Sequence, residues 1–128
     1  MSKANPNRAR NYRSEDTTAD EAVLLMAALD HLHDRVGIAH RLHTTDCCDQ
    51  ALVVVQAALV DAGRWARDDE QLLMDTYAAV AVLHHTEALS PSTWLILNDL
   101  LPRLRERCVV VFRRKTSVPR QREGGESA

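Results

Sequence analysis

Residues 18–43 read TADEAVLLMAALDHLHDRVGIAHRLH and decide the fold. Apolar residues recur here every three or four positions, at Ala22, Leu25, Leu29, Leu32, Val36 and Ala39. Residues at that spacing lie along one side of an α-helix. Thr18 and Glu21 fit a capping box, in which each side chain accepts a hydrogen bond from the backbone amide of the other residue. We therefore predict an amphipathic helix from about residue 18 to about residue 43.

A second helix is predicted over residues 46–62. Thr45 or Asp46 is a suitable N-cap, and Gly63 is a typical residue just past a helix C-terminus. The centre of this segment, residues 51–60, is apolar except for Gln56. A helix that is apolar on every side is typical of the middle of a bundle, so we expect this helix to be the buried one.

A third helix is predicted over residues 68–88. Its first residues are Asp68, Asp69 and Glu70, whose negative charges suit the positive end of the helix dipole. We expect its buried seam to consist of Leu73, Tyr77, Val80 and His84. One ring of the adjacent His84 and His85 should then face the core and the other should face away.

A fourth helix should begin at Ser90 and Pro91, which are typical of an N-cap and a first helical position. Its apolar stripe consists of Trp94, Leu97, Leu101, Leu104, Cys108 and Val111. Pro102 lies inside this stripe. Because proline lacks an amide hydrogen, we expect a kink there or a break at Leu101.

Four helices joined by short loops predict an all-α fold, an antiparallel four-helix bundle. We place the bundle domain at residues 17–114, between a disordered basic arm at 1–16 and a disordered tail at 115–128. Hydrophobic residues are 45% of the 128 residues and aromatic ones only 4%, so the core should consist of Leu, Val and Ala. An α+β fold stays open as an alternative, because the valine-rich segments 53–55 and 109–112 could form short strands.

The charge is distributed unevenly along the chain. The net charge of −2 combines +4 in residues 1–13, −11 in residues 14–102 and +5 in residues 103–128. An acidic surface can steer a basic partner, or imitate a nucleic-acid backbone as small acidic inhibitors of phages and plasmids do. We therefore predict a regulatory or inhibitory protein that binds another protein. The predicted docking residues are Asp61, Asp68, Asp69, Glu70 and Asp75. A homodimer, with basic ends of one copy on the acidic body of another, uses the same complementarity.

Nucleic-acid binding is the alternative function. The basic residues that would neutralise phosphates are Arg103, Arg107, Arg113, Arg114 and Lys115, together with Arg105. The third and fourth helices could also form a helix-turn-helix that presents Ser92, Thr93 and Asn98 to bases. The apolar run 94–97 argues against that exposed position.

A metal site is a second alternative. The candidate ligands are His33, His40, His43 and Cys47, which recur at spacings of four and seven residues. Imidazoles and a thiolate would suit zinc. The interruption at residues 44–46 should turn Cys47 away from the histidines. No cofactor is expected.

Catalytic motifs are missing from the sequence, which has no phosphate-binding glycine loop, nucleophile elbow or dinucleotide fingerprint. The one nucleophile pair worth considering is Cys108 with His84, and Cys108 belongs to an apolar stripe. We expect a protein that is not an enzyme. The three cysteines form a poor disulfide framework, and no signal peptide or membrane-spanning run is apparent. The cytoplasm is the expected compartment.

Overall fold

The computed structural model describes residues 4–127, and it describes the side chains of residues 17–117. Its four α-helices are α1 (Ala4–Leu42), α2 (Asp49–Ala62), α3 (Glu70–His84) and α4 (Pro91–Ser127). Short 3₁₀ turns, Asp46–Cys48 and Arg67–Asp69, precede α2 and α3. The described residues contain no strand. The segments 53–55 and 109–112 lie within α2 and α4, so the α+β alternative is wrong.

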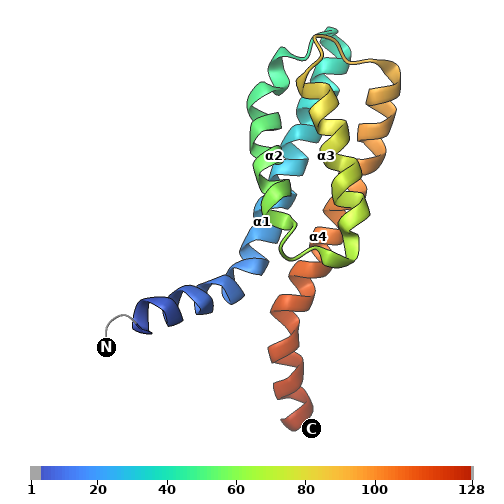
Figure 1. Cartoon of the computed structure of the whole chain (residues 1–128). Coiled ribbons are helices and arrows are strands. Elements are labelled where there is room, and N and C mark those ends of the chain that lie inside the picture. Colours follow the sequence, from blue (N-terminus) through green and yellow to red (C-terminus); the bar gives the residue numbers. More distant parts are fainter. Residues whose placement is uncertain (1–3, 128) are drawn as a thin grey trace.

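The helices run up and down, side by side (Figure 1). Each packs against two neighbours: α1 contacts α2 and α4, and α3 also contacts α2 and α4. The predicted antiparallel four-helix bundle is confirmed. The α1–α2 and α3–α4 connections meet at one end, where the Thr45 amide donates to the Glu87 carbonyl and the Thr45 hydroxyl donates to the Thr86 carbonyl at 2.9 Å.

The predicted apolar stripe of α1 is confirmed, because all six of its residues are buried. The predicted start of the helix is wrong, since α1 begins at Ala4 and Thr18 lies inside it. At its C-terminal end His43 has a left-handed φ of 60°, and its amide donates to the Ala39 carbonyl at 2.8 Å. This conformation ends the helix one residue before the predicted boundary.

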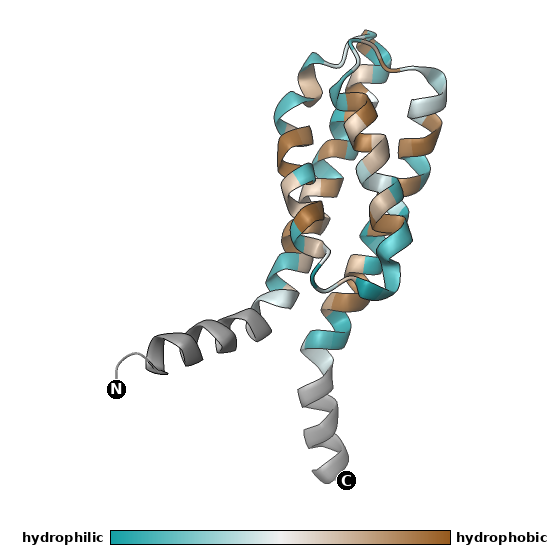
Figure 2. Ribbon diagram, in the orientation of Figure 1, coloured by the Kyte–Doolittle hydropathy of each residue, from teal (hydrophilic) through white to brown (hydrophobic). Residues whose placement is uncertain are grey.

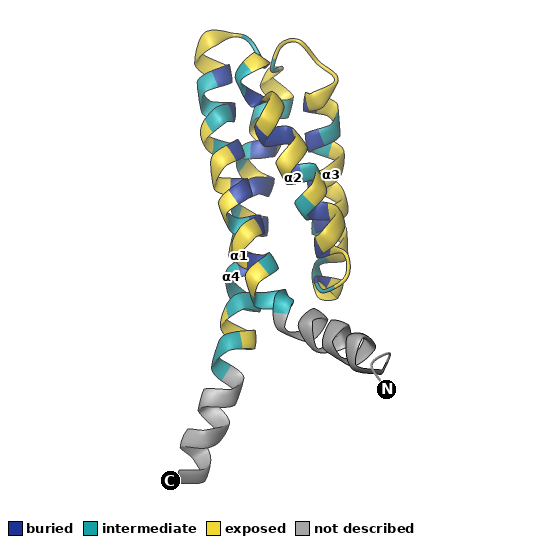
Figure 3. Ribbon diagram, turned by 90° about the vertical axis from the view of Figure 1, so that its left-hand side faces the viewer, coloured by how far each residue is buried: buried dark blue, intermediate teal, exposed yellow. Residues whose placement is uncertain are grey.

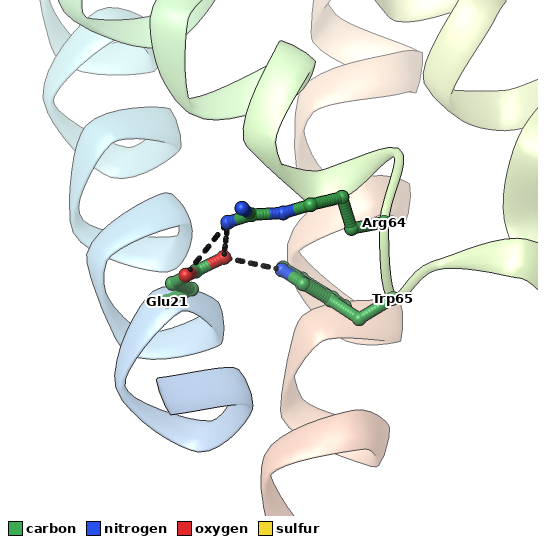
Figure 4. Close-up of polar contacts among 3 residues, drawn as sticks. All are labelled: Glu21, Arg64 and Trp65. Atoms are coloured by element: carbon green, nitrogen blue, oxygen red, sulfur yellow. Dashed lines mark hydrogen bonds and ion pairs between the residues drawn. The ribbon is translucent and has the colours of Figure 1, made fainter. Parts of the chain in front are cut away.

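Glu21 bonds residues of the α2–α3 connection, which replaces the predicted capping box (Figure 4). Arg64 Nη2 donates to both carboxylate oxygens of Glu21, at 2.9 and 3.1 Å. The indole Nε1 of Trp65 donates to Oε1 of the same carboxylate at 3.0 Å. This one acidic side chain therefore ties α1 to the loop at the far end of the bundle.

The outward side of α2 is exposed, so the prediction of a fully buried helix is wrong. Its inward residues are buried, namely Ala51, Leu52, Val55, Leu59 and Ala62. Val53 and Val54 are each 56% exposed, and Val60 is 65% exposed. Every helix of a four-helix bundle keeps one side toward solvent, whatever its composition. Figure 3 shows this alternation of buried and exposed residues along α2 and α3.

The buried seam of α3 differs from the predicted one. Leu73 and Val80 are buried as predicted, and the other buried members are Thr76 and Leu83. Polar Thr76 is tolerated because its hydroxyl donates to the Leu72 carbonyl at 2.7 Å. The predicted seam members Tyr77 and His84 are exposed, and so is His85. Tyr77 follows Thr76 by one residue, which turns its side chain about 100° away from the seam.

The start of α4 is confirmed, because the Ser90 hydroxyl accepts from the Thr93 amide at 3.1 Å and Pro91 is the first helical residue. The predicted stripe is also confirmed: its four central members are buried, and Trp94 and Val111 are partly buried. The helix continues through Pro102, so the predicted break at Leu101 is wrong. Packing along the whole stripe outweighs the one missing amide.

The ends predicted to be disordered are residues 1–16 and 115–128. They lie outside the range of residues whose side chains the structure describes, except for residues 115–117, which continue α4. Among the described helices, none combines the length and the apolar character needed to cross a membrane.

Candidate protein-binding surface

The outward side of α3 exposes apolar side chains. Met74 is 58% exposed, Val82 is 51% exposed, and Ala78 lies exposed between them. Residues four apart share one side of a helix, so these three form a continuous strip. Glu70 precedes the strip at the same spacing, and Asp75 lies beside it. We call these five residues the α3 surface.

A groove of about 380 Å³ lies between α2 and α3. Val60 of α2 and Met74 and Tyr77 of α3 give it an apolar lining. Glu70 and Arg67 add one charge of each sign. Because these residues are largely exposed, the groove opens directly beside the α3 surface.

A second groove, of about 430 Å³, lies on the other side of α3, against α4. Ala78 and Val82 line it from α3, and Ile96 lines it from α4. Asp75 and Asp99 contribute carboxylates. The apolar strip of α3 therefore lies between two grooves, one lined by one acidic side chain and the other by two. Figure 2 shows hydrophobic residues recurring along α3.

The structure brings together only part of the predicted acidic docking set. Glu70 and Asp75 belong to the α3 surface, and exposed Asp68 precedes it in the 3₁₀ turn. Asp61 is exposed on α2 and lines neither groove. Asp69 points the other way, toward α4, and its side chain is only 14% exposed. Three of the five predicted docking residues therefore lie on or next to the α3 surface.

Half of the predicted basic cluster is paired with acidic side chains of the same chain. Three of its arginines form ion pairs at 2.8 to 2.9 Å: Arg103 with Asp99, Arg105 with Asp30 and Arg107 with Asp69. The hydrogen bond to Asp30 raises the pKa of the Arg105 guanidinium. Arg113, Arg114 and Lys115 remain exposed further along α4. The set is thus divided between paired side chains and a short exposed group.

The side of the bundle between α1 and α4 is closed by polar and aromatic contacts. His33 Nε2 lies 2.8 Å from Asn98 Oδ1, and because an amide oxygen accepts, Nε2 is the donor. The His40 ring stacks on Trp94 with centroids 4.1 Å apart and an angle of 5° between the planes. These contacts and the Arg105–Asp30 ion pair join the two helices.

The four predicted metal ligands are not brought together. His33 and His40 make the contacts just described, whereas His43 is exposed at the end of α1. The Cys47 thiol donates to the Arg35 carbonyl at 3.6 Å. Across the described residues, no three His, Cys, Asp or Glu side chains are grouped so that they could hold a metal ion.

The candidate nucleophile Cys108 is 1% exposed in the core, and burial raises its pKa to about 12. Burial likewise raises the pKa of Cys48 to about 12. His84 is exposed on α3, where its ring stacks on that of His85 at 5.5 Å. The structure thus leaves Cys108 as a protonated packing residue and His84 outside the core.

The α3 surface was missed because only a buried seam was predicted for this helix, and Met74, Ala78 and Val82 were assigned to no surface. Residues 72–83 contain more apolar side chains than one buried seam can hold. That excess was the available signal, since a helix in a bundle has only one inward side.

Comparison of the chain with protein-family models, with curated proteins and with solved structures found no match.

Proposed function

We propose that this chain is a small regulatory or inhibitory protein that binds another protein through the α3 surface and performs no covalent chemistry. The exposure of Met74 and Val82 between acidic margins is the observation that carries this proposal. We place the protein in the cytoplasm, where the buried thiols of Cys48 and Cys108 would stay reduced.

The layout of the α3 surface fits a protein interface. Such interfaces have an apolar centre and a polar rim, and their centre is poor in charged residues. Here the centre is Met74, Ala78 and Val82, and the rim carries Glu70 and Asp75. Burial of apolar surface contributes about 25 cal/mol per Å² removed from water. The flexible Met74 side chain would adapt to the contour of the partner.

Charge defines the kind of partner. Residues 49–88 contain seven acidic side chains and two arginines, a net charge of −5. A partner with basic side chains around an apolar centre would complement this region. Complementary charge chiefly raises the association rate and excludes wrong partners, and it weakens as salt is added.

The first experiment identifies the partner by photo-crosslinking. A photoreactive amino acid replaces Ala78 at the centre of the α3 surface, and Glu106 on the outer side of α4 serves as the matched exposed control. In native extract, we expect a protein adduct that forms from position 78 and not from position 106. Identical adducts from both positions, or none from position 78, would contradict the proposal.

The second experiment measures affinity for that purified partner. The test variant reverses three acids near the α3 surface: Asp68→Lys, Glu70→Lys and Asp75→Lys. The control variant reverses three exposed acids of α1 and α4: Asp20→Lys, Asp34→Lys and Glu106→Lys. We expect the test variant to bind at least tenfold more weakly and the control to change less. Equal losses would point to net charge alone as the cause.

A further inference from the structure

The outward side of α2 carries a row of exposed apolar side chains. Val53, Ala57 and Val60 are all exposed, and their spacing of four and three residues places them on one side of the helix. The outward sides of α1 and α4 expose apolar residues such as Leu24 and Leu95 as well as charged ones such as Asp34 and Glu106. Removing exposed valine side chains from water is favourable, so this side of α2 is suited to contact with an apolar surface.

Charged residues of opposite sign lie at the two ends of this apolar row. Asp49 precedes Val53 by four residues, and Arg64 follows Val60 by four. Gly63 has helical backbone angles (φ −57°, ψ −22°), which continue the register of α2 toward Arg64. We call Asp49, Val53, Ala57, Val60 and Arg64 the α2 stripe.

The α2 stripe is complementary to itself. Asp49 and Arg64, and likewise Val53 and Val60, are spaced symmetrically about the midpoint between Gln56 and Ala57. Two antiparallel copies related by a twofold axis at that midpoint would place Val53 opposite Val60 of the second copy. The same arrangement places Asp49 opposite Arg64 of the second copy. A parallel arrangement would instead place like charges together at both ends.

We propose that the chain forms a twofold-symmetric dimer in which the α2 stripes of two copies pack antiparallel. Isologous contacts of this kind are the commonest in homo-oligomers. Ala57 lies next to the axis, where a small side chain allows helices to approach within about 8–10 Å. The dimer goes beyond the proposed function, because it uses none of the five residues of the α3 surface, although Val60 also lines the groove beside that surface.

The Arg64 guanidinium can serve both its own chain and the second copy. Its Nη2 alone makes both bonds to Glu21, and the guanidinium has three further N–H bonds. The Arg64 side chain is 68% exposed, and Asp49 is also exposed. Both charges of the proposed intermolecular pair are thus accessible before association.

The mass of the full chain in solution tests the dimer. We expect light scattering to give twice the 14.4 kDa chain mass at micromolar concentration. Ala57→Arg, which sets like charges beside the axis at an exposed position, should give the monomer mass with unchanged helix content by circular dichroism. A monomeric wild type, or a dimer that survives Ala57→Arg, would overturn the proposal.

A mixing experiment tests the register. Asp49→Arg alone and Arg64→Asp alone should each weaken the dimer about tenfold, because each symmetric dimer then holds two repulsive pairs. A one-to-one mixture should restore it, because both pairs between unlike copies are attractive again. Weakening of each variant without restoration in the mixture would exclude the antiparallel register.

Cysteine crosslinking tests the same register without removing Arg64 from Glu21. Val53→Cys and Val60→Cys chains, oxidised together, should form a mixed disulfide-linked dimer. Each variant oxidised alone should give no more crosslink than wild type, since its new thiols would lie about 10 Å apart along the axis. Equal crosslinking of either variant alone and of the mixture would contradict the arrangement.

Discussion

Replacement of Glu21 by Ala should destabilise the bundle far more than its position near the surface suggests. The carboxylate accepts from Arg64 Nη2 at 2.9 Å and from Trp65 Nε1 at 3.0 Å (Figure 4). Its own side chain is only 22% exposed. The Glu21→Ala variant removes the carboxylate that accepts from both Arg64 and Trp65. The half-buried indole N–H of Trp65 is then left without its hydrogen bond.

The expected loss follows from these two contacts. The ion pair with Arg64, whose side chain is 68% exposed, contributes about 0.5 kcal/mol. The hydrogen bond from Trp65 to a charged acceptor in a part-buried position contributes about 1.5 kcal/mol. Glu21→Ala should therefore cost about 2 kcal/mol and lower Tm by roughly 8 °C. Glu21→Gln, which keeps an acceptor for Trp65, should cost about half as much.

Urea unfolding followed by circular dichroism measures this loss, with the free energy of unfolding extrapolated to water. Asp20→Ala is the matched control, because Asp20 is the neighbouring acid and is exposed. We expect the control to change stability by less than about 0.5 kcal/mol. If Glu21→Ala is as mild as Asp20→Ala, the reasoning about the Glu21 contacts is wrong.

Gly37→Ala should raise the free energy of unfolding by about 0.5–1 kcal/mol in urea titrations, because an added Cβ meets nothing within 4 Å inside α1. Gly63→Ala should raise the free energy of unfolding by less than Gly37→Ala does, or lower it, because its Cβ would lie 3.2 Å from the backbone oxygen of Val60. Pro102→Ala should raise the urea midpoint by the equivalent of about 1–2 kcal/mol, because it restores a backbone donor inside α4. The thiols of Cys48 and Cys108 should resist Ellman's reagent at pH 8 until the chain unfolds. The free energy of unfolding should fall as pH rises above 9.0, because the pKa of a thiol is 9.0 in the unfolded chain. The pKa of both folded thiols is about 12, so they keep their protons up to that pH. Urea titrations at pH 8 and pH 10 check this, and a fall of equal size in Cys108→Ala would contradict it.

The helices could be predicted because their signals are local. The stripe from Ala22 to Ala39 and the Ser90 cap each depend on residues within a few turns, and both are confirmed. The break expected at Leu101 was wrong because a long packed stripe outweighs one proline. The cap expected at Thr18 was wrong because α1 begins at Ala4, and Glu21 bonds Arg64, which is distant in sequence.

The surfaces were harder to predict, because they depend on which side of each helix faces its neighbours. The apolar composition of residues 51–60 led to the prediction that α2 is buried on every side, yet Val53 and Val60 face outward. Tyr77 was assigned to a seam that Thr76 occupies. The acidic residues Glu70 and Asp75 lie on one surface, whereas Asp69 turns toward Arg107 of α4. Such pairings arise only once the helices are packed together.

Titration calorimetry of the captured partner against an Ala78→Arg variant tests the claim of a protein-binding α3 surface most directly. Ala78 is exposed at the centre of that surface, so the substitution adds bulk and positive charge there without touching the core. Glu106→Arg, on the outer side of α4, is the control. We predict that Ala78→Arg weakens binding at least a hundredfold and that Glu106→Arg leaves it within a few-fold of wild type. Wild-type affinity in the Ala78→Arg variant would contradict the account.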